Sequence, residues 1–415
     1  MGTIGKLQLT AETVSAKIRK VNNLKLTILK TIFEHRALSV SEIASLVNLS
    51  LPTLNNILAE LVNDGLIEQK EKGESLGGRK PNLYQLCDGV FHILCLEVER
   101  FAVRLVVLDN NNIVIHEGRS YSLSLSKDAS EVSQLTAVIQ QFVDELNVDW
   151  NNINGIGILM PGLVNSAQGE NQTFFIAPGF NLQAHLEDVF KKKVFLLNDV
   201  KAAALSELNF GAARGLKDVL IIQMDWGIGL GILINGEVYM GHEGFSGEVG
   251  HMVFVEDGQL CYCGKRGCLE TVASGVALVN RAREDINQQM PTLLSERYDV
   301  ETLLPQDIIE AAHAGDQYAI GLIYNLGKNL GKAISYLIQL FNPELIVMSG
   351  KFAAAGTLIT LPIQQGIQTY AMNALENSCR LEVSTLGKNG SIKGIVLFSI
   401  NQYLDMLISN NERSY

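Results

Sequence analysis

The sequence predicts a mixed α/β protein in which a small winged helix-turn-helix head precedes two α/β halves, the second carrying a zinc-binding loop. Three observations predict this fold. Short helices and a pair of short strands have the spacing of a winged head within the first 87 residues. Strand and helix patterns then recur in two successive rounds. In the second round, three of the six cysteines of the chain lie within eight positions.

Length and composition narrow the class of protein. A chain of 415 residues with 47% hydrophobic residues can bury two or three cores, which excludes disordered and fibrous classes. No apolar run reaches the roughly 20 residues that cross a bilayer, and the first 25 residues lack the apolar segment of a signal peptide. We therefore expect a cytoplasmic protein without membrane insertion. Six cysteines in so long a chain are too sparse for a disulfide scaffold.

Charge is distributed unevenly along the chain. The formal net charge is −11, yet residues 1–36 hold seven Lys or Arg against two acidic residues. Residues 1–90 have 11 basic and 9 acidic side chains, which leaves the remainder at −13. A neutral-to-basic head thus precedes an acidic body.

The head contains three helix signals. Apolar residues recur at helical spacing over Asn23–His35. Ser39 and Glu42 form a capping-box pattern, which predicts that a short second helix, Val40–Val47, begins there. A third helix restarts after Ser50, a further N-cap candidate. Two short helices joined by a tight turn are typical of a helix-turn-helix.

The segment after the third helix predicts a wing. Strand patterns at Leu66–Gln69 and Leu83–Leu86 flank a polar, glycine-bearing loop, 71–82. In a winged helix the third helix enters the DNA major groove, so its N-terminal side chains can reach base edges. Asparagine amides suit adenine. The base-contact candidates are Thr53, Asn55 and Asn56.

Basic residues in the wing extend this hypothesis. Arg79 and Lys80 follow two glycines, a pattern suited to a narrow, A·T-rich minor groove. Residues 37–69 contain no Lys or Arg. Phosphate contacts are therefore expected from six basic residues outside that segment: Lys17, Arg19, Lys20, Lys25, Arg79 and Lys80. The alternative is a winged helix that contacts protein instead of DNA.

Strand signals dominate the body and come in two rounds. The first round has strand patterns at 93–96, 103–108, 113–116, 153–159 and 194–197, with a helix over 131–146. The second has strand patterns at 218–224, 229–234 and 344–350. Asn198 and Asp199 lie at a strand end before a helix, the position where open α/β sheets bind ligands.

The strongest chemical signal is a cluster of four soft ligands. His251, Cys261, Cys263 and Cys268 supply the imidazole and three thiolates that tetrahedral Zn²⁺ prefers. Because protein would fill all four positions, the spacing favours a structural zinc over a catalytic one. Three unliganded cysteines are the alternative interpretation. Two carboxylates, Glu248 and Glu270, adjoin this loop; alone, each would be read as a solvated surface acid.

Taken together, these motifs resemble a known family. Asn198-Asp199, Glu248-x-x-His251 and Cys261-x-Cys263-x4-Cys268-x-Glu270 are similar to the ROK family of sugar kinases and sugar-responsive repressors. The head resembles that of the family's repressors of glucose, N-acetylglucosamine and xylose metabolism. The resemblance implies two actin-like, hexokinase-type (ribonuclease H-like) subdomains with sugar in their cleft. The expected domains are a basic arm or helix (1–22), the winged head (23–87) and the ROK sugar-binding domain (88–415), which divides into about 88–200 plus a C-terminal helix and about 201–395.

The resemblance also carries site residues over to this chain. The positions that match sugar contacts are Asn181, Asn198, Asp199, Glu248, His251 and Glu270. Asp199 matches the general base of the kinases, and we expect it to act here as a sugar contact, leaving no catalytic residue. His251 is expected to serve both as a metal ligand and as a sugar contact.

The phosphate-binding turns of the kinases are altered in this sequence. Glu97–Phe101 stands where the kinases have Asp-x-Gly-Gly-Thr, and Asp225–Gly227 stands where they have Gly-Thr-Gly. Ser349–Lys351 replaces a run of consecutive glycines. Phosphoryl transfer depends on open backbone amides at such turns, so we expect no kinase activity.

These observations favour a repressor that binds an A·T-rich, roughly palindromic operator as a homodimer or homotetramer and releases it when a sugar or sugar phosphate binds. Sugar binding is expected to close the two subdomains and alter the spacing of paired heads. The alternatives are a sugar kinase with an appended head, a regulator controlled by a protein partner, and a vestigial sugar site. The residues indicate a polyol ligand and leave its identity, and the choice between induction and corepression, open.

Overall fold

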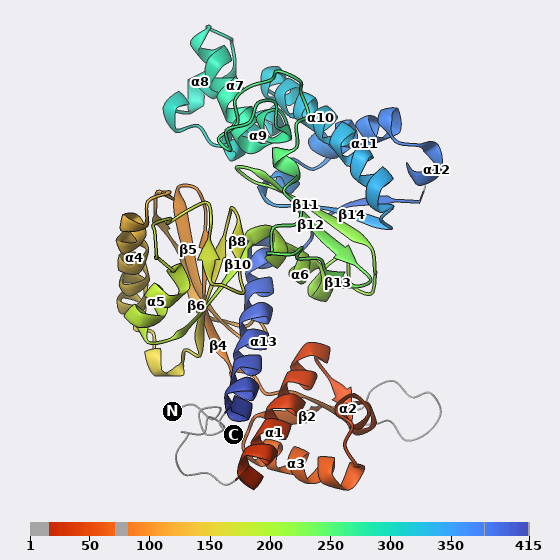
Figure 1. Cartoon of the computed structure of the whole chain (residues 1–415). Helices are drawn as coiled ribbons and strands as arrows, with labels where there is room; N and C mark the ends of the chain where they lie inside the picture. Colours follow the sequence, from red (N-terminus) through yellow and green to blue (C-terminus); the bar gives the residue numbers. More distant parts are fainter. Residues whose placement is uncertain (1–15, 71–81, 377, 414–415) are drawn as a thin grey trace. The chain divides into compact units, whose positions relative to one another are not determined.

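The computed structural model describes residues 16–70, 82–376 and 378–413 (Figure 1). The chain divides into two compact units. The first comprises Met1–Leu197 and Ile395–Tyr415, and the second comprises Asn198–Gly394. The expected class is confirmed: a winged head is followed by two α/β halves. Within the described residues, every helix is too short or too polar to span a bilayer.

The head lies in the first unit and has three helices and a three-stranded sheet of order β1-β3-β2. Its elements are α1 (Ala16–His35), β1 (Leu38–Ser39), α2 (Val40–Val47), α3 (Leu51–Asn63), β2 (Ile67–Lys70) and β3 (Leu83–Leu86). Helix α1 begins seven residues before the predicted start, so the expected boundary at residue 22 falls inside one helix. Helix α2, the start of α3, and strands β2 and β3 lie within one residue of their predicted positions, whereas β1 was not predicted.

Local capping explains where the head helices begin. The backbone N–H of Ser39 donates to Glu42 Oε2 at 2.7 Å, and the N–H of Glu42 donates to Ser39 Oγ, so the predicted capping box is confirmed. Asn48 ends α2 in the left-handed conformation. The Ser50 hydroxyl then accepts from the N–H of Thr53 and starts α3.

The first α/β half is a five-stranded sheet of order β10-β7-β4-β5-β6. Its strands are β4 (His92–Val98), β5 (Ala102–Asp109), β6 (Val114–Ser122), β7 (Gly155–Met160) and β10 (Lys193–Asn198). Strands β4 to β6 form an antiparallel meander, and β7 runs parallel to β4. Helices α4 (Val132–Glu145) and α5 (Leu182–Phe190) contribute to its core, and β8 (Val164–Asn165) pairs with β9 (Glu170–Asn171).

The second half repeats this topology in a sheet of order β13-β12-β11-β14-β15. Its strands are β11 (Val219–Met224), β12 (Ile228–Ile234), β13 (Glu237–Val238), β14 (Leu345–Ser349) and β15 (Arg380–Val383). Again three strands form an antiparallel meander, and β14 is parallel to β11. Both halves therefore have the same order of pairing, which confirms the two-round interpretation.

Helices of the second half bury its largest core against the sheet. They are α7 (Gly275–Asn287), α8 (Leu293–Arg297), α9 (Pro305–His313), α10 (Gln317–Phe341), α11 (Thr357–Tyr370) and α12 (Asn373–Glu376). Helix α6 (Asp199–Phe210) packs in a separate, smaller core with residues of β11, β12 and β14. Gly331 of α10 meets Gly366 of α11, where a side chain on either residue would overlap the other backbone. This close approach fixes α11 against α10.

The C-terminal helix α13 (Gly390–Arg413) connects both units, because its first residues belong to the second unit and the remainder to the first. In the first unit it reaches the head (Figure 1), where Asp405 pairs with Lys30 of α1. Tyr403 of α13 contacts Phe91 edge-to-face, and the side chain of Asn110 accepts from the N–H of Phe91. Helix α13 therefore links the head, through Lys30, to the first α/β half, through Phe91.

Candidate metal centre, sugar site and DNA interface

The four residues predicted as metal ligands come together in the second unit. One ligand atom from each of His251, Cys261, Cys263 and Cys268 lies within 4.8 Å of all the others. His251 Nδ1 is 3.6 Å from Cys261 Sγ, and Cys263 Sγ is 3.6 Å from Cys268 Sγ. Tetrahedral zinc would separate two sulfur ligands by about 3.8 Å and a sulfur from a nitrogen by about 3.6 Å. The donor set and spacing therefore fit a metal ion of that size.

The backbone around the cluster is tightly folded. The N–H of Cys261 donates to Lys265 O at 2.8 Å, and the N–H of Gly264 donates to Cys261 O at 3.0 Å. Gly267 has a φ of +74°, and a Cβ there would overlap Val255 O. The other ring nitrogen of His251, Nε2, is 3.1 Å from the Tyr262 hydroxyl, so Nδ1 faces the cysteines.

Five of the six residues predicted to contact sugar lie in the second unit. Asn198 caps α6, its Oδ1 accepting from the N–H groups of Val200 and Lys201. Asp199, the first residue of α6, is half-buried. Glu270 is only 5% exposed and accepts the N–H of Ile228. Burial, together with the negative charge of the neighbouring Glu248, raises the pKa of Glu270 to about 7.

The remaining two residues of this group flank the same loop. Glu248 directly precedes the short helix that ends at His251. Although its side chain reaches solvent, the surrounding protein raises the pKa of Glu248, and the positive charge of Lys201 opposes that rise. A Cβ on Gly250 would lie 3.2 Å from Glu270 Oε2, so a glycine lets the backbone approach that carboxylate closely.

Lys201 is a residue of this site that the sequence reasoning missed. It is 2% exposed, lies in the first turn of α6, and its ammonium donates to the carbonyl and hydroxyl oxygens of Ser246. Burial lowers the pKa of Lys201 to about 8, while Glu248 and Asp199 oppose that shift. An isolated lysine two positions after Asp199 was the only available signal.

Asn181 differs from the other sugar-site predictions. It lies in the first unit as the N-cap of α5, where its Oδ1 accepts from the N–H of Ala184 at 2.8 Å. Its amide group donates to Gln168 O and Glu170 Oε1. These bonds give Asn181 a structural role at the start of a helix.

Side chains and hydrogen bonds occupy two of the turns that the family resemblance aligns with the phosphate loops of the kinases. Between β4 and β5, the N–H of Glu99 donates to Ala102 O at 2.8 Å, which closes a hairpin. After β11, Asp225 Oδ1 accepts from the N–H of Lys351 at 2.6 Å, and Gln223 donates to Asp225 Oδ2. The Asp225 carboxylate thus accepts a hydrogen bond from the backbone N–H of Lys351, the residue after Gly350.

The candidate base-contact residues lie on the exposed face of α3. Leu54, Ile57 and Leu58 are buried in the head, whereas Thr53, Asn55 and Asn56 are exposed. Thr53 Oγ1 is 2.9 Å from Ser50 Oγ at the helix start. In the described part of the chain, the amides of Asn55 and Asn56 make no hydrogen bond, so both can accept partners from outside.

The expected phosphate contacts need one correction. Lys25 is 9% exposed and pairs with Glu60 at 2.8 Å and with Asp64 at 3.6 Å, so it holds α1 against α3 and is not available to a phosphate. Lys20 is exposed and Arg19 is half-buried. Arg79 and Lys80 lie outside the described residues.

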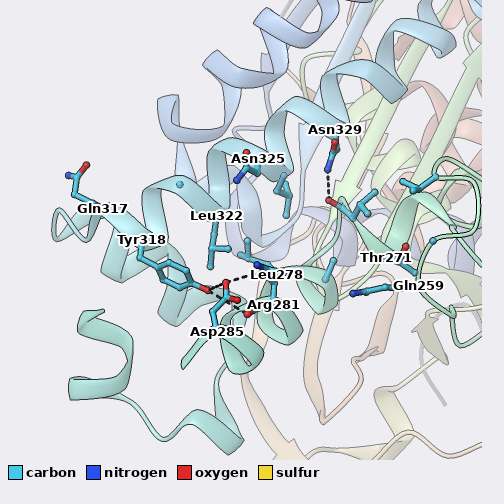
Figure 2. Close-up of a pocket in the computed structure, with 16 residues that line it drawn as sticks. Gln259, Thr271, Leu278, Arg281, Asp285, Gln317, Tyr318, Leu322, Asn325 and Asn329 are labelled. Carbon is cyan, nitrogen blue, oxygen red and sulfur yellow. Dashed lines mark hydrogen bonds and ion pairs between the residues drawn. The ribbon is translucent and has the colours of Figure 1, made fainter. Parts of the chain in front are cut away.

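A separate pocket of about 640 Å³ lies between α7, α10 and residues 255–272, the segment that contains the three cysteines of the cluster (Figure 2). On its wall, Asp285 accepts from Arg281 Nε and from the Tyr318 hydroxyl, each at 2.9 Å. Asn329 donates to Val272 O at 3.2 Å. Among the described residues, none that is predicted to contact sugar, metal or DNA lines this pocket, so it is distinct from the predicted sugar and metal sites.

Comparison with known sequences places these features in a family. The ROK family profile matches residues 94–401. The chain belongs to the ROK family. A profile of winged helix-turn-helix DNA-binding domains matches residues 21–68 of this ROK chain.

Relatives of this ROK chain include named repressors. It is 28% identical to the xylose repressor of Caldicellulosiruptor bescii, over 93% of this chain and 97% of that protein. It is also 28% identical to the DNA-binding transcriptional dual regulator NagC of Escherichia coli K12, over 89% of this chain and 90% of that protein.

Solved structures similar to this ROK chain include a regulator and a kinase. A ROK family transcriptional regulator, described as a homologue of the Escherichia coli MLC protein, matches 95% of this chain and 98% of its own, with 28% identity and a TM-score of 0.74. The ROK glucokinase of Streptomyces griseus, in complex with glucose and AMPPNP, matches 74% of this chain and 98% of its own, with 25% identity and a TM-score of 0.64.

Proposed function

We propose that this chain is a sugar-responsive transcriptional repressor of carbohydrate-utilisation genes. The head binds operator DNA through α3, and a sugar or sugar phosphate bound in the second unit weakens that binding. The observation that carries the proposal is the joining, in one chain, of a winged DNA-binding head to a ROK body that keeps Asn198, Asp199, Glu248, His251 and Glu270. A kinase needs no such head.

The sugar site combines acceptors with a rigid support. Asp199 and Glu248 offer carboxylate oxygens, which accept hydrogen bonds from sugar hydroxyls. A structural Zn²⁺, held by the cluster of His251 and the three cysteines, would fix the loop from which Glu248 and Glu270 project. The names of the relatives favour a pentose such as xylose or a hexosamine such as N-acetylglucosamine as the effector class.

The same proposal excludes sugar phosphorylation. Asp225 accepts a hydrogen bond from the N–H of Lys351, and the N–H of Glu99 donates to Ala102 in a hairpin. Neither N–H is then available to bind a phosphate, as the backbone N–H groups at these turns of a kinase are. Loss of one preorganised donor can cost roughly 3 kcal/mol of transition-state stabilisation. The observation that favours the opposite function, a kinase with an appended head, is that Asp199 keeps the general-base position.

Operator release can occur only if sugar binds one state of the protein more tightly than the other. Each tenfold difference corresponds to about 1.4 kcal/mol. An A·T-rich, roughly palindromic operator requires at least a homodimer, because each head reads one half-site. A regulator controlled by a protein partner in place of sugar would show no response to sugar in purified form.

The test uses the purified full chain and labelled duplexes that tile the regions upstream of its own gene and the neighbouring genes. Fluorescence anisotropy is measured with and without D-xylose, D-glucose, N-acetyl-D-glucosamine and their 6- or 5-phosphates. We expect specific binding to one duplex, released by one member of the panel. Binding to no duplex contradicts the repressor proposal, and binding that no sugar alters contradicts the sugar response.

A further inference from the structure

A buried ammonium group spans two segments of the proposed sugar site. Lys201 lies on α6, two residues after Asp199, and Ser246 lies 45 residues later, two residues before Glu248. Lys201 Nζ donates to both the carbonyl and the hydroxyl oxygen of Ser246, each at 2.5 Å. One side chain therefore connects the helix that carries one carboxylate to the loop that carries the other.

Three glycines shape the loop that carries Ser246. Gly241, Gly244 and Gly247 all adopt positive φ values, between 78° and 89°, which glycine reaches without steric cost. Ser246 is the polar anchor between them: its N–H donates to Met240 O at 3.2 Å, and its hydroxyl donates to Tyr239 O at 2.6 Å. Among the described residues, removal of the ammonium leaves Ser246 with hydrogen bonds only to Tyr239 and Met240 of its own segment.

Burial of a lysine ammonium costs free energy of folding unless hydrogen bonds and opposite charges compensate for the lost water. Lys201 as a whole residue is 2% exposed, and buried charged groups persist in proteins when they are paired and hydrogen-bonded. Lys201 has two oxygen acceptors on Ser246, and two carboxylates, Asp199 and Glu248, act on it electrostatically. Its positive charge also offsets the mutual repulsion of these carboxylates.

We propose that Lys201 is a positioning residue of the sugar site, which braces the Glu248 loop against α6 and balances the charges of Asp199 and Glu248. This inference rests on the proposed function only for the identity of the ligand. No residue predicted from the motifs has this role, because the bracing contact joins positions that are distant in sequence.

The charge of Lys201 gives the proposal a pH signature. The charged groups that face it are Asp199 on its own helix and Glu248 on the opposing loop, and Glu270 lies beyond them as a neighbour of Glu248. Because burial lowers the pKa of Lys201 to about 8, the ammonium is present at lower pH and is lost as pH rises through that value. Sugar affinity should therefore fall as pH rises above about 8.

The experiment compares four full-length proteins: the natural chain, Lys201→Met, Lys201→Arg and the control Lys217→Met, an exposed lysine of the same unit. Hydrogen–deuterium exchange of the segment 240–248 is measured first, without sugar. We expect faster exchange in Lys201→Met alone. Equal exchange in all four proteins overturns the brace, whatever the ligand is.

Sugar affinity is then measured by titration calorimetry between pH 6.5 and 9.5 with D-xylose, D-glucose and N-acetyl-D-glucosamine. We expect Lys201→Met to bind about tenfold more weakly, the loss associated with one charged hydrogen bond. Lys201→Arg should bind without the decline above pH 8, since arginine keeps its charge. If Lys201→Met keeps the sugar affinity and pH profile of the natural chain, the positioning role of Lys201 is wrong and the proposed function stands. If the natural chain binds no sugar, the proposed function is wrong, and the exchange experiment alone tests whether Lys201 braces the loop.

Discussion

Removal of one thiolate from the cluster tests the metal centre. In Cys263→Ser the pair of sulfur atoms 3.6 Å apart is reduced to one, and zinc keeps three of its four protein ligands. The matched control is Cys379→Ser, because Cys379 is half-buried in the same unit and its thiol lies outside the cluster. We expect one zinc per chain in the natural protein and the control, and almost none in Cys263→Ser after dialysis against a competing chelator.

The stability effect follows from mass action. Zinc held at a free concentration about 1,000 times its dissociation constant stabilises the folded state by about 4 kcal/mol. For a unit of 150–250 residues, each kcal/mol shifts the melting temperature by about 2–4 °C. Loss of the metal should therefore lower the melting temperature of the second unit by roughly 8–16 °C. Metal content comes from atomic absorption and melting from differential scanning calorimetry.

Two results would refute this reasoning. Equal zinc content in Cys263→Ser and the natural chain would show that the four side chains do not act together as ligands. Loss of zinc without any change in melting temperature would show that the ion does not support the loop that carries Glu248 and Glu270.

Four further outcomes are expected. Asn55→Ala and Asn56→Ala should each reduce discrimination at one half-site base pair by about 1–3 kcal/mol in competition anisotropy, and an unchanged base preference would contradict the docking of α3. Arg79→Ala should weaken binding more for operators with A·T-rich flanks than for G·C-rich ones; an equal loss on both would exclude the minor-groove contact. In a coupled assay with ATP and a panel of hexoses, hexosamines and pentoses, the natural chain should show no turnover in the kinase range of about 1–100 s⁻¹, and turnover at such rates would disprove the blocking role of Asp225. Asp199→Asn should weaken sugar binding by about tenfold in titration calorimetry, since a charged acceptor is lost; full retention would place the sugar elsewhere.

Features that depend on nearby residues could be predicted from the sequence. The capping box of Ser39 and Glu42 spans three positions, and its bonds set the start of α2. The cluster of His251 and three cysteines spans 18 positions, because short loops with glycines bring its members together. The presence of two α/β halves was also predicted from two rounds of similar strand patterns, whereas the order in which the strands pair is seen only in the structure.

Features that depend on distant partners could not be predicted. Lys25 looked available to phosphate because its partners, Glu60 and Asp64, lie on another helix. Lys201 looked like an ordinary helix lysine because its acceptor, Ser246, is 45 residues away. The periodicity of one segment predicts which face of a helix is apolar. It does not predict which distant side chain will contact the polar face.

Asn181 is a third case: its sequence pattern indicates a helix N-cap, whereas the family resemblance assigned it as a sugar contact. An asparagine immediately before an apolar-periodic segment is the pattern of a helix N-cap. The structure shows that capping bond, from the N–H of Ala184 to Asn181 Oδ1. The match to a family sugar contact stays a prediction, and the observed bonds favour the structural role.

Coupling between sugar and operator is the central claim of the proposed function, and thermodynamic linkage tests it most directly. Sugar affinity is measured by titration calorimetry on the free protein and on the protein saturated with its operator. If sugar weakens operator binding by a given factor, the operator must weaken sugar binding by the same factor. The account predicts a lower sugar affinity in the operator complex by that factor. Identical sugar affinities in the free and operator-bound protein would contradict it.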